Sequence, residues 1–327
     1  MAHSIAILEK PSQIVTFLPA LEKCFGEDVV IATTMMLGPY RFSYRRDRKM
    51  SDVPIVAEPE FRIDTGYRER ARLYYGGKPI LLSRDPVAEI GRRIHSADRV
   101  ICATDCDHTG LLAFYDLLDA VDFDKACDPI DRSYPAIFPP SWYSDDVLKH
   151  ARLAAEGLSG VTRGTPVLLY GQARRWFTYN FNLNSLVLWG SEPHVTKFML
   201  LALAWLALQE KPVSEGQLAR RMQGRWQGPK YRDQNLGSPA SILPIIQTLM
   251  TGGLVERDED DRGRGLRLTV KGREFMDRLH PDCIDHDLPG RLDAWCQAGL
   301  DASRPAMERY IRTFFGKARR YRVRQVP

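Results

Sequence analysis

One stretch decides how the first half of the chain folds: Val100-Ile101-Cys102-Ala103-Thr104-Asp105-Cys106-Asp107-His108-Thr109-Gly110. Its first residues are apolar or small, which predicts a buried strand, and two carboxylates follow where that strand ends. Side chains alternate along an extended backbone, so Asp105 and Asp107 are expected on the same side. Gly110 then lets the chain turn into an apolar helix over residues 111–121. Two carboxylates this close repel each other, and Mg²⁺ is a counter-ion that prefers such hard oxygen ligands.

A second predicted strand also ends in a carboxylate. The chain reads Ile5-Ala6-Ile7-Leu8-Glu9-Lys10-Pro11-Ser12, and a helix is expected over residues 13–25, directly behind it. Sites in open α/β sheets form where neighbouring strands end, so Glu9 is expected to converge with Asp105 and Asp107. An Asp-x-Asp motif alone is more often a capped turn than a metal site. A second strand that ends in a carboxylate favours the metal site.

Together the two stretches resemble the TOPRIM domain shared by topoisomerases, primases and some nucleases. The wording Glu9-Lys10-Pro11-Ser12 is most similar to the topoisomerase III-like branch of the type IA topoisomerases. The resemblance implies a catalytic site in which Glu9, Asp105 and Asp107 hold Mg²⁺ while Lys10 supports the scissile phosphate.

The chain departs from the family pattern directly after the two aspartates. Thr109 and Leu111 stand where the family has glutamates, and His108 stands where it usually has arginine. Losing two carboxylates weakens a Mg²⁺ site, and Leu111 has the character of a helix-packing residue. The resemblance therefore implies the fold and leaves metal-dependent chemistry open.

Composition suits a protein that binds nucleic acid in a reducing compartment. The 327 residues are 44% hydrophobic, enough for two domains with cores, and the net charge is +5. The six cysteines contain no Cys-x-x-Cys pair, so neither a zinc ribbon nor a disulfide framework is expected. The longest apolar run, residues 198–208, is too short to span a bilayer. The first apolar run is interrupted by Glu9 and Lys10, so no signal peptide is expected. We expect a cytoplasmic protein with no membrane partner.

Alternating short strands and helices predict a TOPRIM-like, doubly wound parallel α/β sheet over residues 1–135. Further strands are expected at 29–32 and 79–82, and a helix at 86–96. The remaining predicted segments, in chain order, are a linker with an Arg-rich helical segment over 136–195, an α+β winged-helix domain over 196–280 and a helical basic C-terminal tail over 281–327.

The winged-helix prediction rests on the order of helices and a hairpin. Helices are expected over 196–208, after the capping box Ser214-Glu215-Gly216-Gln217, and over 238–250, followed by a hairpin around Asp258-Glu259-Asp260-Asp261. The third helix would enter a major groove by helix-turn-helix logic. Pro244 and the acidic run argue against strong readout, so a structural or protein-binding module is an equal alternative.

Basic residues gather in three places that suit a phosphate backbone. These are the aromatic-interleaved segment 38–49, the stretch 171–186, which resembles the Arg-rich helix beside the type IA active site, and the last residues of the chain. The residues expected to bind DNA, single-stranded or duplex, are Arg41, Arg45, Arg46, Arg174, Arg175, Arg319 and Arg320. Each group has a plainer explanation: a solvated loop, surface arginines on a packed helix, and a solvated tail.

The family has a large gate region that bears its nucleophilic tyrosine, and residues 186–196 leave no room for one. Tyr310-Ile311-Arg312-Thr313 resembles the wording around that nucleophile. Phe314 and Phe315 instead predict an amphipathic helix with Tyr310 in its core. We therefore expect the chain not to relax supercoiled DNA.

Three functions follow as alternatives. The first is a DNA-binding, gate-less topoisomerase-like protein in plasmid or mobile-element DNA metabolism, a context implied by the resemblance alone. The second is a Mg²⁺-dependent DNA-cleaving enzyme, a nuclease or miniature topoisomerase, that uses Glu9, Asp105 and Asp107. The third is a structural partner that docks on a relaxase or a topoisomerase.

Overall fold

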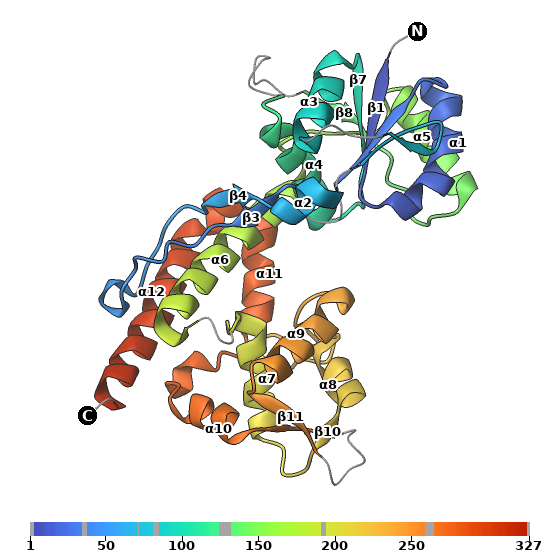
Figure 1. Ribbon diagram of the computed structural model, residues 1–327. Coiled ribbons are helices and arrows are strands. Elements are labelled where there is room, and N and C mark those ends of the chain that lie inside the picture. The colour runs from blue at the N-terminus through green and yellow to red at the C-terminus, as the bar shows by residue number, and fades with distance from the viewer. Residues whose placement is uncertain are drawn as a thin grey trace. The chain divides into compact units, whose positions relative to one another are not determined.

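The computed structural model of the chain describes residues 3–34, 38–70, 72–80, 85–123, 132–190, 194–258 and 265–325. It divides into two compact units (Figure 1). The first holds Met1–Ser43 and Glu60–Gln172, and the second holds Tyr44–Pro59 and Ala173–Pro327. The short stretch Tyr44–Pro59 therefore leaves the first unit and belongs to the second.

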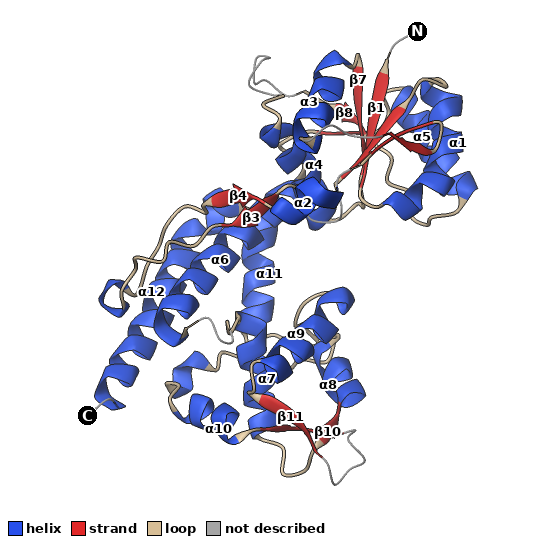
Figure 2. Cartoon of the chain, viewed as in Figure 1, coloured by secondary structure: helices blue, strands red, loops and turns tan. Residues whose placement is uncertain are grey.

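The first unit is built on a mixed sheet, whose strands β1 and β7 are labelled in Figure 2. The strands lie in the order β6-β5-β2-β1-β7. Their bounds are β1 Ser4–Leu8, β2 Val30–Thr33, β5 Leu73–Tyr75, β6 Lys78–Ile80 and β7 Arg99–Ala103. β1 runs parallel to both of its neighbours, with Ile5 opposite Val30 in β2 and Val100 in β7. β5 and β6 run antiparallel, so the prediction of a wholly parallel sheet holds only for β2, β1 and β7.

The turn between β5 and β6 explains the antiparallel pair. Gly76 and Gly77 connect the two strands, and both have positive φ, 53° and 72°. A two-residue loop with positive φ at both positions favours glycine and joins antiparallel neighbours, whereas a parallel connection needs roughly a dozen residues. The strand predicted at 79–82 is thus the second arm of a hairpin; residues 81 and 82 lie outside the described part of the chain.

Helices cover both faces of this sheet: α1 (Ile14–Phe25), α3 (Pro86–Ser96), α4 (His108–Ala120) and α5 (Ser144–Ala155). Ala6 and Ile31 pack on the face with α1 and α5, whereas Ile5 and Val30 pack on the face with α3 and α4. Adjacent strand residues that are buried in opposite directions are typical of a sheet covered on both sides. The first unit is therefore a mixed α/β structure that contains parallel strands.

The first unit extends further along the chain than the predicted boundary at residue 135. α5 lies in the segment predicted as linker and helix, 136–195, yet it packs against α1 on the sheet. Its Val147 is fully buried there. Residues 136–172 belong to the first core because the apolar side of α5 needs a surface that buries it.

Smaller elements complete the first unit. They are β3 (Tyr40–Phe42), β4 (Phe61–Ile63), α2 (Thr65–Arg70), β8 (Tyr134–Pro135) and β9 (Gly160–Val161). β3 pairs antiparallel with β4, and β8 pairs antiparallel with β9.

The second unit combines long helices with a small sheet in the strand order β10-β12-β11. Its elements are α6 (Pro166–Trp189), which begins in the first unit, α7 (Lys197–Ala207), β10 (Val213–Ser214), α8 (Glu215–Met222), α9 (Pro239–Thr251), β11 (Val255–Asp258), β12 (Gly265–Leu268), α10 (Val270–Asp277), α11 (Leu288–Ala298) and α12 (Leu300–Gln325). Aromatic rings join α6 to its neighbours, since Phe181 contacts Phe315 of α12 and Phe177 contacts Trp295 of α11. Within the described residues, no helix has both the length and the apolar character needed to cross a membrane.

The elements from α7 to α10 follow the order predicted for residues 196–280. Helices α7, α8 and α9 and the β11–β12 hairpin lie where they are expected. The predicted capping box is present, because Ser214 Oγ accepts from the Gln217 backbone and Gln217 Oε1 accepts from the Ser214 backbone. Residues 259–264, with most of the acidic run, lie outside the described residues.

Candidate functional site

The sheet brings Glu9 and Asp105 together where two neighbouring strands end. β1 and β7 are adjacent and parallel, so the residues that follow them share one edge. The Asp105 backbone N–H donates to Glu9 Oε2 at 3.4 Å. Lys10 Nζ lies between the two carboxylates, 3.2 Å from Glu9 Oε1 and 3.2 Å from Asp105 Oδ2. We call this group the Glu9–Lys10–Asp105 corner.

Gln13 completes the corner, and the sequence reasoning did not single it out. Its Nε2 donates to Asp105 Oδ1 at 2.9 Å. Its Oε1 accepts from the backbone N–H groups of Glu9 and Lys10, at 2.9 and 2.7 Å. Its position in the first helical turn after Pro11 could have indicated this role, because side-chain amides there often bond back to the preceding backbone.

Asp107 has a different role from Asp105. Its Oδ1 accepts from the backbone N–H groups of Thr109 and Gly110, both at 2.8 Å, so it caps the N-terminus of α4. Gly110 lies inside α4 rather than in the predicted turn, and a Cβ there would be 2.3 Å from the Asp105 carbonyl oxygen. The capped-turn explanation therefore describes Asp107, and Gly110 permits a close backbone approach.

Burial and neighbouring charges shift the pKa values of Glu9 and Lys10. Glu9 is only 5% exposed. Burial, with repulsion from Asp105, raises the pKa of Glu9 to about 7, although Lys10 acts in the opposite direction. Burial also opposes the charge of Lys10, but its contacts with Asp105 and Glu9 outweigh that effect and raise the pKa of Lys10. The ammonium group is therefore the internal counter-ion of these carboxylates.

The carboxylates predicted to hold Mg²⁺ already have partners in this arrangement. In the part of the chain that the structure describes, no three His, Cys, Asp or Glu side chains are placed to hold a metal ion. The Lys10 ammonium lies between Glu9 and Asp105, and Asp107 is engaged as a cap. Leu111 is buried in the core of the first unit.

Arg41 is held within the first unit. Its Nη2 lies 2.9 Å from Asp64 Oδ2, and its Nη1 donates to the Tyr40 carbonyl at 2.9 Å. These contacts fix Arg41 at the β3–β4 hairpin. A phosphate bound there would compete with Asp64.

Arg45 and Arg46 lie on the stretch Tyr44–Pro59, which asparagines of α6 hold in place. Asn184 Oδ1 accepts from Ile55 N at 2.6 Å while Asn184 Nδ2 donates to Ile55 O at 2.7 Å. One turn earlier, Asn180 makes the same two bonds to Ala57, at 2.8 and 3.0 Å. Each side-chain amide thus bonds to both the backbone N–H and the C=O of one residue, as a neighbouring β-strand would. We call Tyr44–Pro59 the clamped segment.

α12 also contacts the clamped segment. Arg319 Nη1 donates to the Ser51 carbonyl at 2.8 Å, and Arg304 forms an ion pair with Glu58. The exposed residues Arg309, Arg312 and Arg320 fall within about a quarter turn of each other on α12. Viewed down the helix axis, Arg319 lies next to Arg312. Because Arg319 bonds to Ser51, this basic side of α12 borders the clamped segment. Arg45 and Arg46 are exposed on that segment.

Arg174 and Arg175 lie on α6 and are half-buried. The guanidinium of Arg174 is 5.9 Å from the centre of the Phe198 ring. Close by, Lys197 is buried and donates to Thr178 Oγ1 at 2.9 Å. Burial, with repulsion from Arg174, lowers the pKa of Lys197 to about 7. Arg174 therefore packs within the second unit, and no residue pattern pointed to its buried neighbour Lys197.

Tyr310 lies in the aromatic core of the second unit. Its ring contacts Phe177, Trp295 and Phe314, at 5.8, 5.7 and 5.6 Å between ring centres. Burial raises the pKa of Tyr310 well above its usual value. This environment suits a packing residue, as the amphipathic pattern predicts, and does not suit an activated nucleophile.

α9, the helix expected to enter a major groove, carries no charged residue. Its exposed side presents Leu243, 62% exposed, together with Pro244 and Gln247. Affinity for a phosphate backbone comes mainly from cations, and among these three exposed residues only Gln247 could hydrogen-bond a base edge. This surface favours the alternative of a structural or protein-binding module.

Comparison with known proteins gives little. No family model matches the chain, and no curated protein matches it. Among solved structures, full-length topoisomerase I from Thermotoga maritima is similar at a TM-score of 0.40 and 13% identity. The similarity covers 62% of this chain and 29% of that protein's length. A TM-score of this size does not show that two proteins share a fold.

Proposed function

We propose that this chain binds DNA by its phosphate backbone, on the basic side of α12 and the clamped segment. The observation that carries the proposal is the fixed pairing of two basic elements. Asn180 and Asn184 hold the segment that bears Arg45 and Arg46, and Arg319 ties it to α12. Cations on a fixed surface bind a polyanion by releasing its condensed counterions without first ordering a loop.

The finer assignment rests on the motif resemblance. We propose a TOPRIM-like fold for the first unit and a winged-helix fold for the elements from α7 to α10, in a gate-less topoisomerase-like protein of plasmid or mobile-element DNA metabolism. The uncharged exposed side of α9 supports a protein-docking role for the winged helix, with a relaxase or a topoisomerase as the partner implied by the resemblance. We do not propose strand passage, because the Tyr310 hydroxyl is buried within the aromatic core of the second unit.

The binding proposal is tested by removing two charges from the basic side of α12. Arg312→Gln combined with Arg320→Gln should weaken DNA binding about equally for all sequences, because phosphates carry no sequence information. The salt slope, the change in log K per unit of log salt, should fall by about 2, since each lost phosphate contact removes ~0.9 on duplex DNA.

Fluorescence anisotropy with labelled DNA measures both effects. Lys23→Gln combined with Lys78→Gln is the matched control, since it removes the same charge from exposed sites on the first unit. Equal losses in the two double variants would mean that net charge acts without a defined surface, against the proposal.

A Mg²⁺-dependent enzyme is the second candidate, because Glu9 and Asp105 do converge. We expect millimolar Mg²⁺ to leave the thermal midpoint of the wild type unchanged. Lys10→Ala should gain a Mg²⁺-dependent rise, about 2–4 °C for each kcal/mol of binding free energy, because two adjacent carboxylates lose their counter-ion.

Thermal denaturation with and without Mg²⁺ measures this, and Lys23→Ala on the exposed side of α1 is the control. A rise in the wild type would favour the enzyme. A thermal midpoint of Lys10→Ala that does not rise with Mg²⁺ would mean that the Lys10 ammonium does not occupy a site for Mg²⁺ between Glu9 and Asp105.

A further inference from the structure

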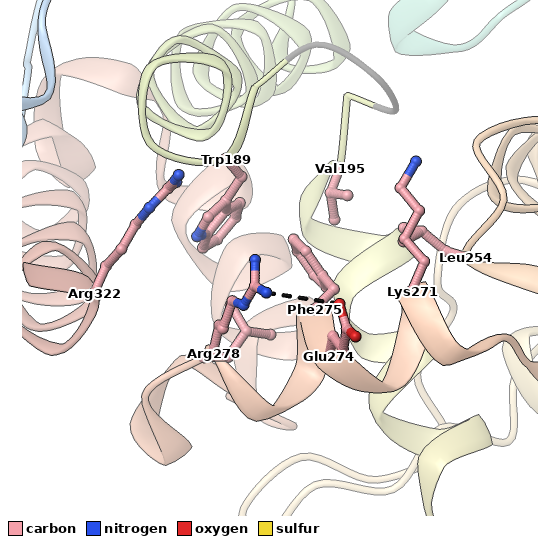
Figure 3. A pocket seen from close by; sticks show the side chains of 9 residues that line it. Trp189, Val195, Leu254, Lys271, Glu274, Phe275, Arg278 and Arg322 are labelled. Atoms are coloured by element: carbon pink, nitrogen blue, oxygen red, sulfur yellow. Dashed lines mark ion pairs between the residues drawn. The ribbon is translucent and has the colours of Figure 1, made fainter. Parts of the chain in front are cut away.

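A cavity of about 190 Å³ lies in the second unit, where the end of α6 meets α10 and α12 (Figure 3). Its apolar lining comes from Trp189, Val195, Leu254, Phe275 and Leu279. Its charged lining comes from Lys271, Glu274, Arg278 and Arg322. The cavity thus combines aromatic walls with long cationic side chains.

The aromatic walls are held by packing. The rings of Trp189 and Phe275 meet edge to face, with centres 5.9 Å apart and planes at 78°. Trp189 also contacts Phe315 of α12, at 5.7 Å between ring centres. Rigid aromatic walls of this kind favour a flat ring that stacks against them.

The charged lining favours an anion. Among the described residues around the cavity, three are cations and Glu274 is an anion. Glu274 pairs with Arg278 at 3.6 Å, and Lys271 Nζ donates to the Gly252 carbonyl at 2.8 Å. The positive excess and the aromatic walls together suit a ligand that is flat, apolar on its faces and attached to a negative group.

The size of the cavity limits that ligand to one ring system. Sites for drug-sized molecules have volumes of about 300–1,000 Å³, well above this one. Arg322 lies on α12, one turn beyond Arg319, so the lining of the cavity continues the basic helix that we propose holds a phosphate backbone.

We propose that this cavity takes one unpaired nucleobase, which stacks on Phe275 and meets the nearly perpendicular Trp189 ring with its edge, while an adjoining phosphate meets Arg278 and Arg322. The inference rests on the proposed DNA binding and specifies it, because a base can enter only from a single-stranded segment. Base stacking on aromatic side chains tolerates any sequence, so the site adds preference for single strands without sequence readout.

The experiment compares three labelled strands of equal length and charge by fluorescence anisotropy with the full chain. One strand is wholly abasic, one carries a single central thymidine in an abasic background, and one is all thymidine. The single thymidine should tighten binding about tenfold over the abasic strand. Phe275→Leu should remove that preference, because leucine offers no ring face on which the base can stack.

Arg278→Gln is the second variant, on a side chain that is 70% exposed, and it should weaken all three strands. Arg273→Gln is the matched control, since this exposed arginine lies on α10, which Arg278 directly follows, and does not line the cavity. It should keep the thymidine preference.

Equal wild-type affinity for the abasic and single-thymidine strands would overturn the inference while leaving backbone binding intact; the cavity would then suit an acidic peptide with an aromatic side chain. A thymidine preference that survives Phe275→Leu would place the base elsewhere, against the inference. Failure of every strand to bind at low salt would contradict the proposed function as well.

Discussion

Replacing Asn184 by alanine is expected to lower the free energy of unfolding by about 2–5 kcal/mol, because it removes the partners of both the backbone N–H and the backbone C=O of Ile55. Asn184 accepts from Ile55 N and donates to Ile55 O, and both residues are buried. Alanine restores neither bond, and each buried group left unpaired costs about 1–3 kcal/mol. Chemical denaturation monitored by tryptophan fluorescence measures the loss.

The same variant should weaken DNA binding, because the clamped segment loses one of its two amide pairs. Asn235→Ala is the control: this exposed asparagine accepts one backbone bond, from Gly224, at 2.7 Å. Its loss should cost about 0.5–1.5 kcal/mol and leave DNA affinity unchanged. Equal stability losses in the two variants would mean that Asn184 does not hold the clamped segment.

Replacing Lys197 by methionine is expected to raise the free energy of unfolding at pH 7 by roughly 3 kcal/mol, because a buried charge is replaced by an apolar side chain of similar length. Lys197 is 6% exposed and opens α7, where the helix dipole also disfavours a cation. Burial, with Arg174 nearby, lowers its pKa to about 7.

The sign of the pH dependence follows from that pKa. Between about 7 and the ordinary value of 10.5, the unfolded chain holds the proton and the folded chain does not. The contribution to stability is therefore largest above pH 10.5 and is lost as the pH falls toward 7. This rise of wild-type stability with pH should disappear in Lys197→Met.

Lys230→Met is the control for Lys197→Met, since Lys230 is exposed. It should leave the pH dependence in place. A Lys197→Met variant less stable than the wild type at pH 7 would mean that the ammonium makes a net favourable contribution, contrary to this account.

The corner could be anticipated from sequence because its geometry follows from strand order alone. Apolar runs that stop at Glu9 and just before Asp105 predict two strand ends, and adjacent parallel strands bring such ends together. The position of Lys10 between the carboxylates could not be read in this way. It depends on side-chain reach and on Gln13, which orients Asp105 from the next turn.

The contacts that hold Tyr44–Pro59 could not be predicted from the sequence, because they join residues far apart in the chain. Asn180 and Asn184 sit one turn apart on α6, yet their partners lie more than a hundred residues earlier in the chain. Local patterns identify a helix, and only the folded chain shows what a buried polar side chain pairs with. The basic residues can be found in the sequence, but the contacts that hold the clamped segment against α6 and α12 join residues far apart in the chain.

The dependence of DNA affinity on salt tests the central claim most directly. Labelled single-stranded and duplex DNA are titrated with the full chain between about 50 and 200 mM salt. If Arg45, Arg46, Arg309, Arg312 and Arg320 each meet a phosphate, log K should fall with log salt at a slope of about −4 to −5 on duplex DNA and about −3 to −4 on single strands. No binding at the lowest salt, or binding with a slope near zero, would contradict the account.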